Sequence, residues 1–136
     1  MKVLYVCVHN SGRSQMAAAF FRQMADPARA DAVSAGTQPG ERVHPVVVDV
    51  MRESGLDISR NQPQRLTNEL VRDATLLITM GCGDECPYVP GLQRDDWPLP
   101  DPKNRPVDEV RQVRDEIRAR VMDLLHARGW ARAATE

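Results

Sequence analysis

The sequence is poor in cysteine and has no excess of charge of either sign. Its 3 cysteines are too few, and odd in number, for the disulfide framework of a small secreted domain. The 18 Lys and Arg residues balance 19 Asp and Glu residues, and the net charge of -1 excludes a broadly basic surface for nucleic acid. Any anion that the protein binds is therefore expected to be held by a local site.

Long hydrophobic runs are also missing. Residues 1–8 form too short an apolar stretch for a secretory signal and lack a small-residue cleavage site, and no later segment reaches the roughly 20 apolar residues of a membrane span. We therefore expect a cytoplasmic monomer that binds neither membrane nor nucleic acid. A chain of 136 residues is long enough for one domain, 1–136, that buries roughly two thirds of its unfolded surface.

Short apolar runs alternate with helical patterns along the chain. Residues 3–8 and 32–35 predict buried strands, and residues 74–80 predict a central strand that is apolar through its middle. Four helices are predicted: one from Ser14, one from Pro45 to a stop at Gly55, a short one capped by Thr67, and one from Val107 to a stop at Gly129. Prolines cluster in residues 87–106, which predicts a long loop. The alternation indicates a three-layer α/β domain with a parallel sheet, whose ligand site lies at the carboxyl ends of the strands.

The most informative segment is residues 7–14, Cys-Val-His-Asn-Ser-Gly-Arg-Ser, which follow the first strand. They open a helix, so their N–H groups and the positive helix end can surround a tetrahedral oxyanion while Arg13 binds two of its oxygens. The same field favours the thiolate form of Cys7, which makes this residue a candidate nucleophile. The candidate oxyanion-binding residues are Val8, His9, Asn10, Ser11, Gly12, Arg13 and Ser14.

Two other interpretations of this loop are open. Residues 7–14 approximate the nucleotide-binding pattern of Gly, four residues, Gly, Lys and Ser or Thr, but Cys7 replaces the first glycine and Arg13 replaces the lysine. Alternatively, Cys7 is a buried thiol at the end of a strand and Arg13 a surface residue. The joint presence of Cys, Asn, Gly, Arg and Ser at a strand-to-helix junction favours the oxyanion site.

Two further thiols, Cys82 and Cys86, follow the central strand in a glycine-containing segment. Their spacing brings the two Cα atoms to about 6 Å if one helical turn forms, which is within disulfide range. Such a pair could carry oxidising equivalents away from Cys7. A zinc site of the three thiols and His9 is the alternative, but it lacks the two compact ligand pairs typical of structural zinc and leaves Arg13 without a role. We therefore expect no metal.

One carboxylate in the proline-rich stretch is a candidate general acid. Asp101 precedes Pro102 in a stiff segment that could hold the carboxylate over the oxyanion site, although an aspartate before proline is also common in turns. Beside the Cys-Arg loop we favour the catalytic role. Two histidines, His44 before a proline and His126 in the last helical turn, are interpreted as capping and dipole-facing residues, and neither is assigned to the site.

These motifs together resemble the low-molecular-weight protein tyrosine phosphatase superfamily over nearly the whole chain. The resemblance rests on residues 7–14, 34–36, 55–59 and 101–102. Within that fold, residues 10–17, 81–87 and 113–117 look like the arsenate reductases, especially the thioredoxin-coupled type. The resemblance implies a sheet of four parallel strands, and the segment with two extra cysteines is its specific part.

A relay of three thiols is what the resemblance implies for function. Cys7 would attack arsenate held by the loop amides and Arg13, while Asp101 protonates the departing oxygen. Cys82 would then attack Cys7 in the adduct, arsenite would leave, and Cys86 would attack Cys82. Thioredoxin would reduce the final disulfide, and no tightly bound cofactor is implied. The two electrons that convert arsenate to arsenite come from two thiols that become a disulfide.

Several alternatives stay open at this point. A low-molecular-weight protein tyrosine phosphatase would use the nucleophile, arginine and aspartate but not Cys82 or Cys86, although Lys103 stands where such phosphatases carry a tyrosine. An arsenate reductase could instead depend on mycothiol or glutaredoxin, although mycothiol-dependent relatives usually lack the segment with two extra cysteines. Gram-positive thioredoxin-coupled members carry a longer interval between the last two cysteines than this chain does. A non-catalytic redox or metal sensor would use the thiols but not Arg13. Within the family resemblance, Asn10 and Ser14 correspond to residues that shape the loop and favour the thiolate.

Overall fold

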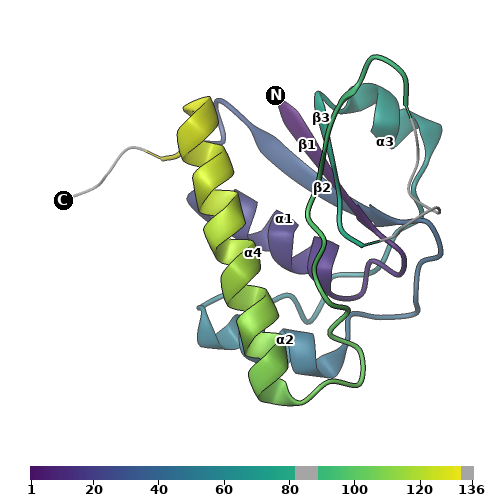
Figure 1. The fold of residues 1–136 in the computed structure, drawn as a ribbon, viewed down its shortest axis with the longest axis vertical. Helices are drawn as coiled ribbons and strands as arrows, with labels where there is room; N and C mark the ends of the chain where they lie inside the picture. Colours follow the sequence, from purple (N-terminus) through teal and green to yellow (C-terminus); the bar gives the residue numbers. More distant parts are fainter. Residues whose placement is uncertain (82–88, 133–136) are drawn as a thin grey trace.

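The computed structural model describes residues 1–81 and 89–132, and its centre is a four-stranded parallel sheet (Figure 1). The strands are β1 (Lys2–Cys7), β2 (Asp31–Gly36), β3 (Leu76–Thr79) and β4 (Gln93–Asp96). Their order across the sheet is β2-β1-β3-β4, and each neighbouring pair is parallel. The predicted α/β class with four parallel strands is therefore confirmed.

Helices cover both faces of the sheet unequally. They are α1 (Arg13–Met24), α2 (Pro45–Glu53), α3 (Asn68–Asp73) and α4 (Val107–Arg128). In Figure 1, α1, α2 and α4 lie on one side of the sheet and the short α3 lies on the other. Side chains from the three helices, such as Phe20, Met51 and Ile117, share the larger core with β1 and β3. A smaller core that includes Leu4 and Leu77 lies beneath α3, which completes the three predicted layers.

The termini of the helices follow the signals in the sequence. The Thr67 hydroxyl accepts a hydrogen bond from the Leu70 N–H at 3.2 Å, so it caps α3 as predicted. Pro45 occupies the first turn of α2, where its missing N–H costs nothing. Gly129 ends α4 with a φ of 70°, in the left-handed region that glycine adopts without strain.

The predicted loop of residues 87–106 contains a strand that the sequence pattern does not indicate. β4 has the sequence Gln-Arg-Asp-Asp, and all four residues are exposed at the edge of the sheet. An edge strand with both faces in water carries no apolar alternation, so periodicity could not find it. Trp97 follows directly, is buried, and places its ring 5.5 Å from that of Tyr5. Within the described ranges, no helix is long and apolar enough to cross a membrane.

The sheet brings three loops to one edge. β1 ends at Cys7, which lies opposite Gly36 at the end of β2, and Val6 lies opposite Thr79 at the end of β3. Because all strands run the same way, the segments after β1, β2 and β3 leave from the same side. This carboxyl edge holds the candidate site.

Candidate functional site

Cys7 lies at the end of β1 with only 2% of its surface exposed. Its Sγ is 2.9 Å from the Oγ of Ser14, in the first turn of α1. The chain between them turns through Asn10, whose φ of 51° lies in the left-handed region that asparagine tolerates better than most residues. The strand-to-helix junction therefore wraps around the sulfur.

The carbonyl groups of this loop point away from its centre. Three of them accept hydrogen bonds from backbone N–H groups outside the loop: Val8 from Gln38 at 2.8 Å, His9 from Gly40 at 2.9 Å, and Ser11 from His44 at 2.9 Å. In a planar trans peptide the N–H points opposite to the C=O, so the N–H groups that follow these carbonyls face the inside of the loop. Together with the N-terminus of α1 they form a set of donors suited to a tetrahedral oxyanion.

The Arg13 guanidinium closes one side of the loop. Its side chain is 7% exposed, its Nη1 donates to the Leu99 carbonyl at 3.0 Å, and its Nη2 lies 3.7 Å from Oδ2 of Asp101. A guanidinium has five N–H donors, and these two partners engage only part of them. Arg13 is buried and is not a surface residue, so the part of the alternative interpretation that concerned Arg13 is wrong, while Cys7 is buried at the end of β1 as that interpretation also expects.

Asp101 is held by its own turn next to Arg13. Its Oδ1 accepts the Lys103 N–H at 3.0 Å, and its carbonyl accepts from the Arg105 Nε at 2.8 Å. Asp101 is therefore a turn aspartate whose second carboxylate oxygen faces the guanidinium, and whose side chain is 44% exposed. Its role as general acid stays a prediction.

The residue that precedes Cys82 also contacts the site. Gly81 has a φ of 78°, and a Cβ at this position would collide with Nη1 of Arg13. Cys82 and Cys86 themselves lie outside the described residues, so the predicted disulfide is not part of the described geometry. The contact nevertheless brings the start of the cysteine segment against the guanidinium.

A cavity of about 330 Å³ opens beside the loop. It is lined by His9, Ser11, Gly40, Glu41, Arg42, His44 and Lys103. His44 occupies the N-cap position of α2, as the sequence predicts, but its side chain makes no cap hydrogen bond. The side chain lines this cavity instead, which the sequence does not predict. Burial lowers the pKa of His44, while the Asp101 carboxylate acts in the opposite direction, so the neutral ring is favoured.

No metal cluster is found in the part of the chain that the structure describes, where no group of three His, Cys, Asp or Glu side chains could hold an ion. The zinc site considered for the three thiols and His9 depends on Cys82 and Cys86, so this finding does not test it. The expectation that the protein holds no metal accordingly stays a prediction.

A cluster of amides behind the loop was missed by sequence reasoning. The Asn10 Nδ2 donates to the Ser14 Oγ at 2.7 Å, and its Oδ1 accepts from the Gln64 N–H at 3.0 Å and from the Gln15 Nε2 at 3.1 Å. Gln15 belongs to the motif that carried the family resemblance, but nothing in a single sequence connects it to residues 61–64. Its burial, at 4% exposed, is the signal that only the fold supplies.

The sequence profile of the low molecular weight phosphotyrosine protein phosphatase family matches residues 2–131. The chain belongs to this family. The match covers every strand and helix of the fold, from β1 to α4. The loop after β1 and Arg13 stay the predicted oxyanion-binding residues of this chain, and Asp101 stays the predicted general acid.

Similar members of the family include proteins named as arsenate reductases. A putative arsenate reductase of Halobacterium salinarum is 36% identical over 126 residues, 88% of this chain and 87% of the relative. A glutaredoxin arsenate reductase of Synechocystis is 35% identical over 127 residues, 91% of this chain and 95% of the relative. The solved structure of a thioredoxin-dependent arsenate reductase of Corynebacterium glutamicum has a TM-score of 0.79 and 36% identity; the match covers 93% of this chain and 60% of that one.

Proposed function

We propose that this protein is an arsenate reductase that uses Cys7 as its nucleophile and Cys82 and Cys86 as an internal disulfide relay. The observation that carries the proposal is the contact of Gly81 with the Arg13 guanidinium. A phosphatase needs an oxyanion loop and an acid, but it has no need of thiols that enter the same site. Here the residue before Cys82 lies against the group that would hold the anion. The relatives named as arsenate reductases support the same reaction.

The first chemical step uses the described residues. The loop N–H groups and Arg13 hold the arsenate oxygens, and the Cys7 sulfur forms a bond to arsenic while one As–O bond breaks. Asp101 donates the proton to the departing oxygen, which leaves as water. The Ser14 Oγ lies 2.9 Å from the sulfur and holds the nucleophile in place before the attack.

The second step moves two electrons to arsenic. The Cys82 thiolate attacks the Cys7 sulfur, an S–S bond forms, and the electron pair of the S–As bond stays on arsenic, which leaves as arsenite. Cys86 then attacks Cys82 and releases Cys7 as a thiolate. Reduced thioredoxin converts the Cys82 to Cys86 disulfide back to two thiols, so no tightly bound cofactor is required. We assign this cycle to one domain, 1–136, acting as a monomer in the cytoplasm.

Two related functions share the same loop. A phosphatase would use Cys7, Arg13 and Asp101, and the family to which the chain belongs is named for that activity. A reductase regenerated by glutaredoxin or mycothiol would need fewer protein thiols, and one relative is named as a glutaredoxin arsenate reductase. Both alternatives predict that Cys86 is dispensable.

The test is arsenate-dependent NADPH consumption with thioredoxin and thioredoxin reductase, compared between the wild-type protein and Cys82→Ser and Cys86→Ser. We expect turnover that each substitution abolishes, together with one arsenite per protein in a single turnover of Cys86→Ser, because Cys82 still completes the reduction. Parallel assays contain glutaredoxin with glutathione, or mycothiol with its redoxin.

Hydrolysis of an aryl phosphate is the matched control, because it uses the loop without the relay. Unchanged hydrolysis in both variants shows that the loop is intact. Turnover that survives in Cys86→Ser with glutaredoxin or mycothiol would overturn the thioredoxin relay and keep the reductase. Hydrolysis of the aryl phosphate without any arsenate-dependent turnover would show that the protein is a phosphatase and not an arsenate reductase.

A further inference from the structure

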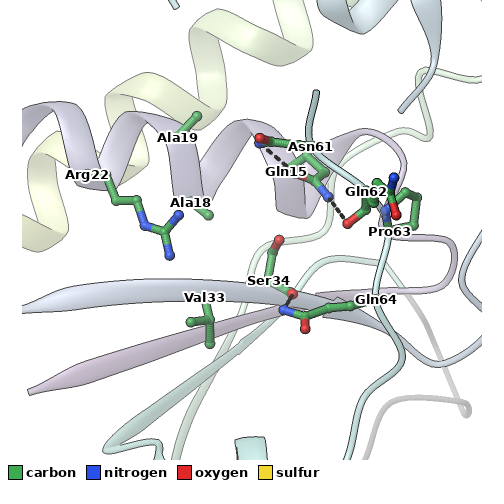
Figure 2. A pocket seen from close by; sticks show the side chains of 10 residues that line it. All are labelled: Gln15, Ala18, Ala19, Arg22, Val33, Ser34, Asn61, Gln62, Pro63 and Gln64. Carbon is green, nitrogen blue, oxygen red and sulfur yellow. Dashed lines mark hydrogen bonds between the residues drawn. The ribbon is translucent and has the colours of Figure 1, made fainter. Parts of the chain in front are cut away.

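A polar pocket of about 440 Å³ lies next to the nucleophile loop, between α1, β2 and residues 61–64. Figure 2 shows its lining residues, which come from α1, from β2 and from residues 61–64. Two members of this lining contact the loop at Asn10: Gln15 through its side chain, and Gln64 through its backbone N–H. The pocket wall and the loop are therefore connected by a buried side chain and by a backbone group.

The orientation of the Asn10 amide is fixed by a backbone group. The N–H of Gln64 can only donate, so the Asn10 atom 3.0 Å from it is the oxygen. The Asn10 nitrogen consequently faces Ser14 and donates to its Oγ at 2.7 Å. With this donor in place, the Ser14 hydroxyl proton is free to point at the Cys7 sulfur, which lies 2.9 Å away. A hydrogen bond donated to sulfur favours the thiolate over the thiol.

Gln15 holds this chain of hydrogen bonds from the pocket side. Its Nε2 donates to both the carbonyl and the Oδ1 of Asn10, at 3.2 and 3.1 Å, which supports the left-handed turn at that residue. Its Oε1 accepts from the Asn61 Nδ2 at 3.2 Å, and its Nε2 also approaches the Gln62 carbonyl at 3.5 Å (Figure 2). The segment of residues 61–64 thereby holds the Gln15 amide, and Gln15 and the Gln64 N–H together hold Asn10 in its orientation.

We propose that Gln15 is a positioning residue for the nucleophile: it orients Asn10 so that the Ser14 hydroxyl donates to Cys7. The inference rests on the proposed function only in taking Cys7 as the nucleophile. It assigns a role to a side chain that contacts neither the sulfur nor the oxyanion loop interior, and it makes the 61–64 segment part of what sets the reactivity of the thiol.

The test is the pH profile of Cys7 alkylation by iodoacetamide, followed by mass spectrometry of the peptide that contains Cys7. Gln15→Met keeps the length of the side chain and the helix propensity but donates no hydrogen bond. We expect Gln15→Met to slow alkylation about tenfold at a pH below the midpoint of the profile and to move the midpoint upward. Without Gln15, the Ser14 hydroxyl loses the orientation in which it donates a hydrogen bond to the charged Cys7 sulfur. Gln62→Ala is the matched control, since it changes the same pocket wall and keeps the backbone carbonyl that Gln15 contacts.

A double-mutant cycle separates positioning from a general structural effect. If Gln15 acts through Ser14, Gln15→Met adds no further change in a Ser14→Ala background, whereas a loosened fold slows alkylation equally in both backgrounds. An equal effect in both, or a profile of Gln15→Met that coincides with the wild type, would overturn the proposal. Alkylation needs neither arsenate nor thioredoxin, so this outcome is independent of whether the protein reduces arsenate. If arsenate-dependent turnover were absent while Gln15→Met still slowed the alkylation of Cys7, only the proposed function would be rejected.

Discussion

Arg13 and Arg114 both meet carboxylates through side chains that are largely covered, but they are paired in different ways. Arg13 lies 3.7 Å from Asp101, and its shorter contact, at 3.0 Å, is to a backbone carbonyl. Arg114, which is 12% exposed, approaches Glu53 at 2.7 Å. Arg111 takes the second oxygen of Glu53 at 2.9 Å, so both carboxylate oxygens are occupied.

The difference separates a structural ion pair from a binding site. The Glu53 cluster joins the end of α2 to the first turns of α4 and leaves the carboxylate no oxygen for a further partner. Arg13 is more buried than Arg114, with 7% against 12% of its side chain exposed, and it keeps unused donors. A desolvated charge with incomplete pairing is costly unless a ligand completes it, so we expect the weaker contact, at Arg13, to be the one that accepts an external anion.

Replacement of Arg13 is expected to have the largest effect on activity. Arg13→Lys keeps the charge but loses the planar pair of donors, so kcat/KM for arsenate should fall about 1000-fold, by analogy with loss of an oxyanion donor. Steady-state reduction of arsenate measures the change. Arg114→Lys is the control: it should lower the melting temperature and leave kcat/KM within about twofold, because the partners of Arg114 are Glu53, Asp115 and the Val50 carbonyl and none of them belongs to the loop. Equal losses of activity in Arg13→Lys and Arg114→Lys would show that the two arginines do not differ in function.

Substitution of Gly81 tests the wall of the Arg13 site with a smaller expected effect. Gly81→Ala places a methyl group where the Arg13 guanidinium lies, and kcat/KM should fall about tenfold or more as the guanidinium moves. Gly91→Ala is a matched control, because Gly91 has a similar φ of 82° but no atom within 4 Å of the added Cβ. Both variants place an alanine in the left-handed region, at a similar cost in backbone strain. The difference in kcat/KM between them therefore measures the effect of the contact with Arg13. If the two lose the same activity, the contact has no role.

Part of this site could be predicted from the sequence, and the rest depends on distant contacts. Cys7, Arg13 and Ser14 lie within one strand-to-helix junction, where local pattern determines geometry. Gly81 could be singled out only as a flexible neighbour of Cys82, because its contact with Arg13 joins loops far apart in the chain. Gln15 had no predicted role for the same reason, since its partners Asn61 and Gln62 follow another helix.

The fold, like the site, has parts that the local sequence pattern predicts and parts that it does not. Strands and helices with one apolar face were predicted close to their observed ends, as with α4, which spans Val107–Arg128 and stops at Gly129 as expected. β3 is shorter than the predicted segment of residues 74–80, because only Leu76–Thr79 pairs with both neighbours. β4 was missed as a pattern and expected only through the family resemblance, since a fully exposed strand buries no side chain that could reveal it.

Removal of the Glu53 carboxylate should have the smallest effect and should spare activity. Hydrogen bonds from Arg111 and Arg114 lower the pKa of Glu53 from 4.5 to about 2. A depressed pKa means that the folded state favours the carboxylate, so its stabilising contribution is complete above about pH 4.5 and is lost as the pH falls toward about 2. Urea unfolding should therefore find Glu53→Gln slightly less stable than the wild type at pH 7, with the difference shrinking at pH 3, while arsenate turnover at pH 7 is unchanged. The effect is small because the carboxylate is exposed and screened. A stability difference that does not vary with pH, or a loss of turnover, would show that Glu53 does more than join α2 to α4.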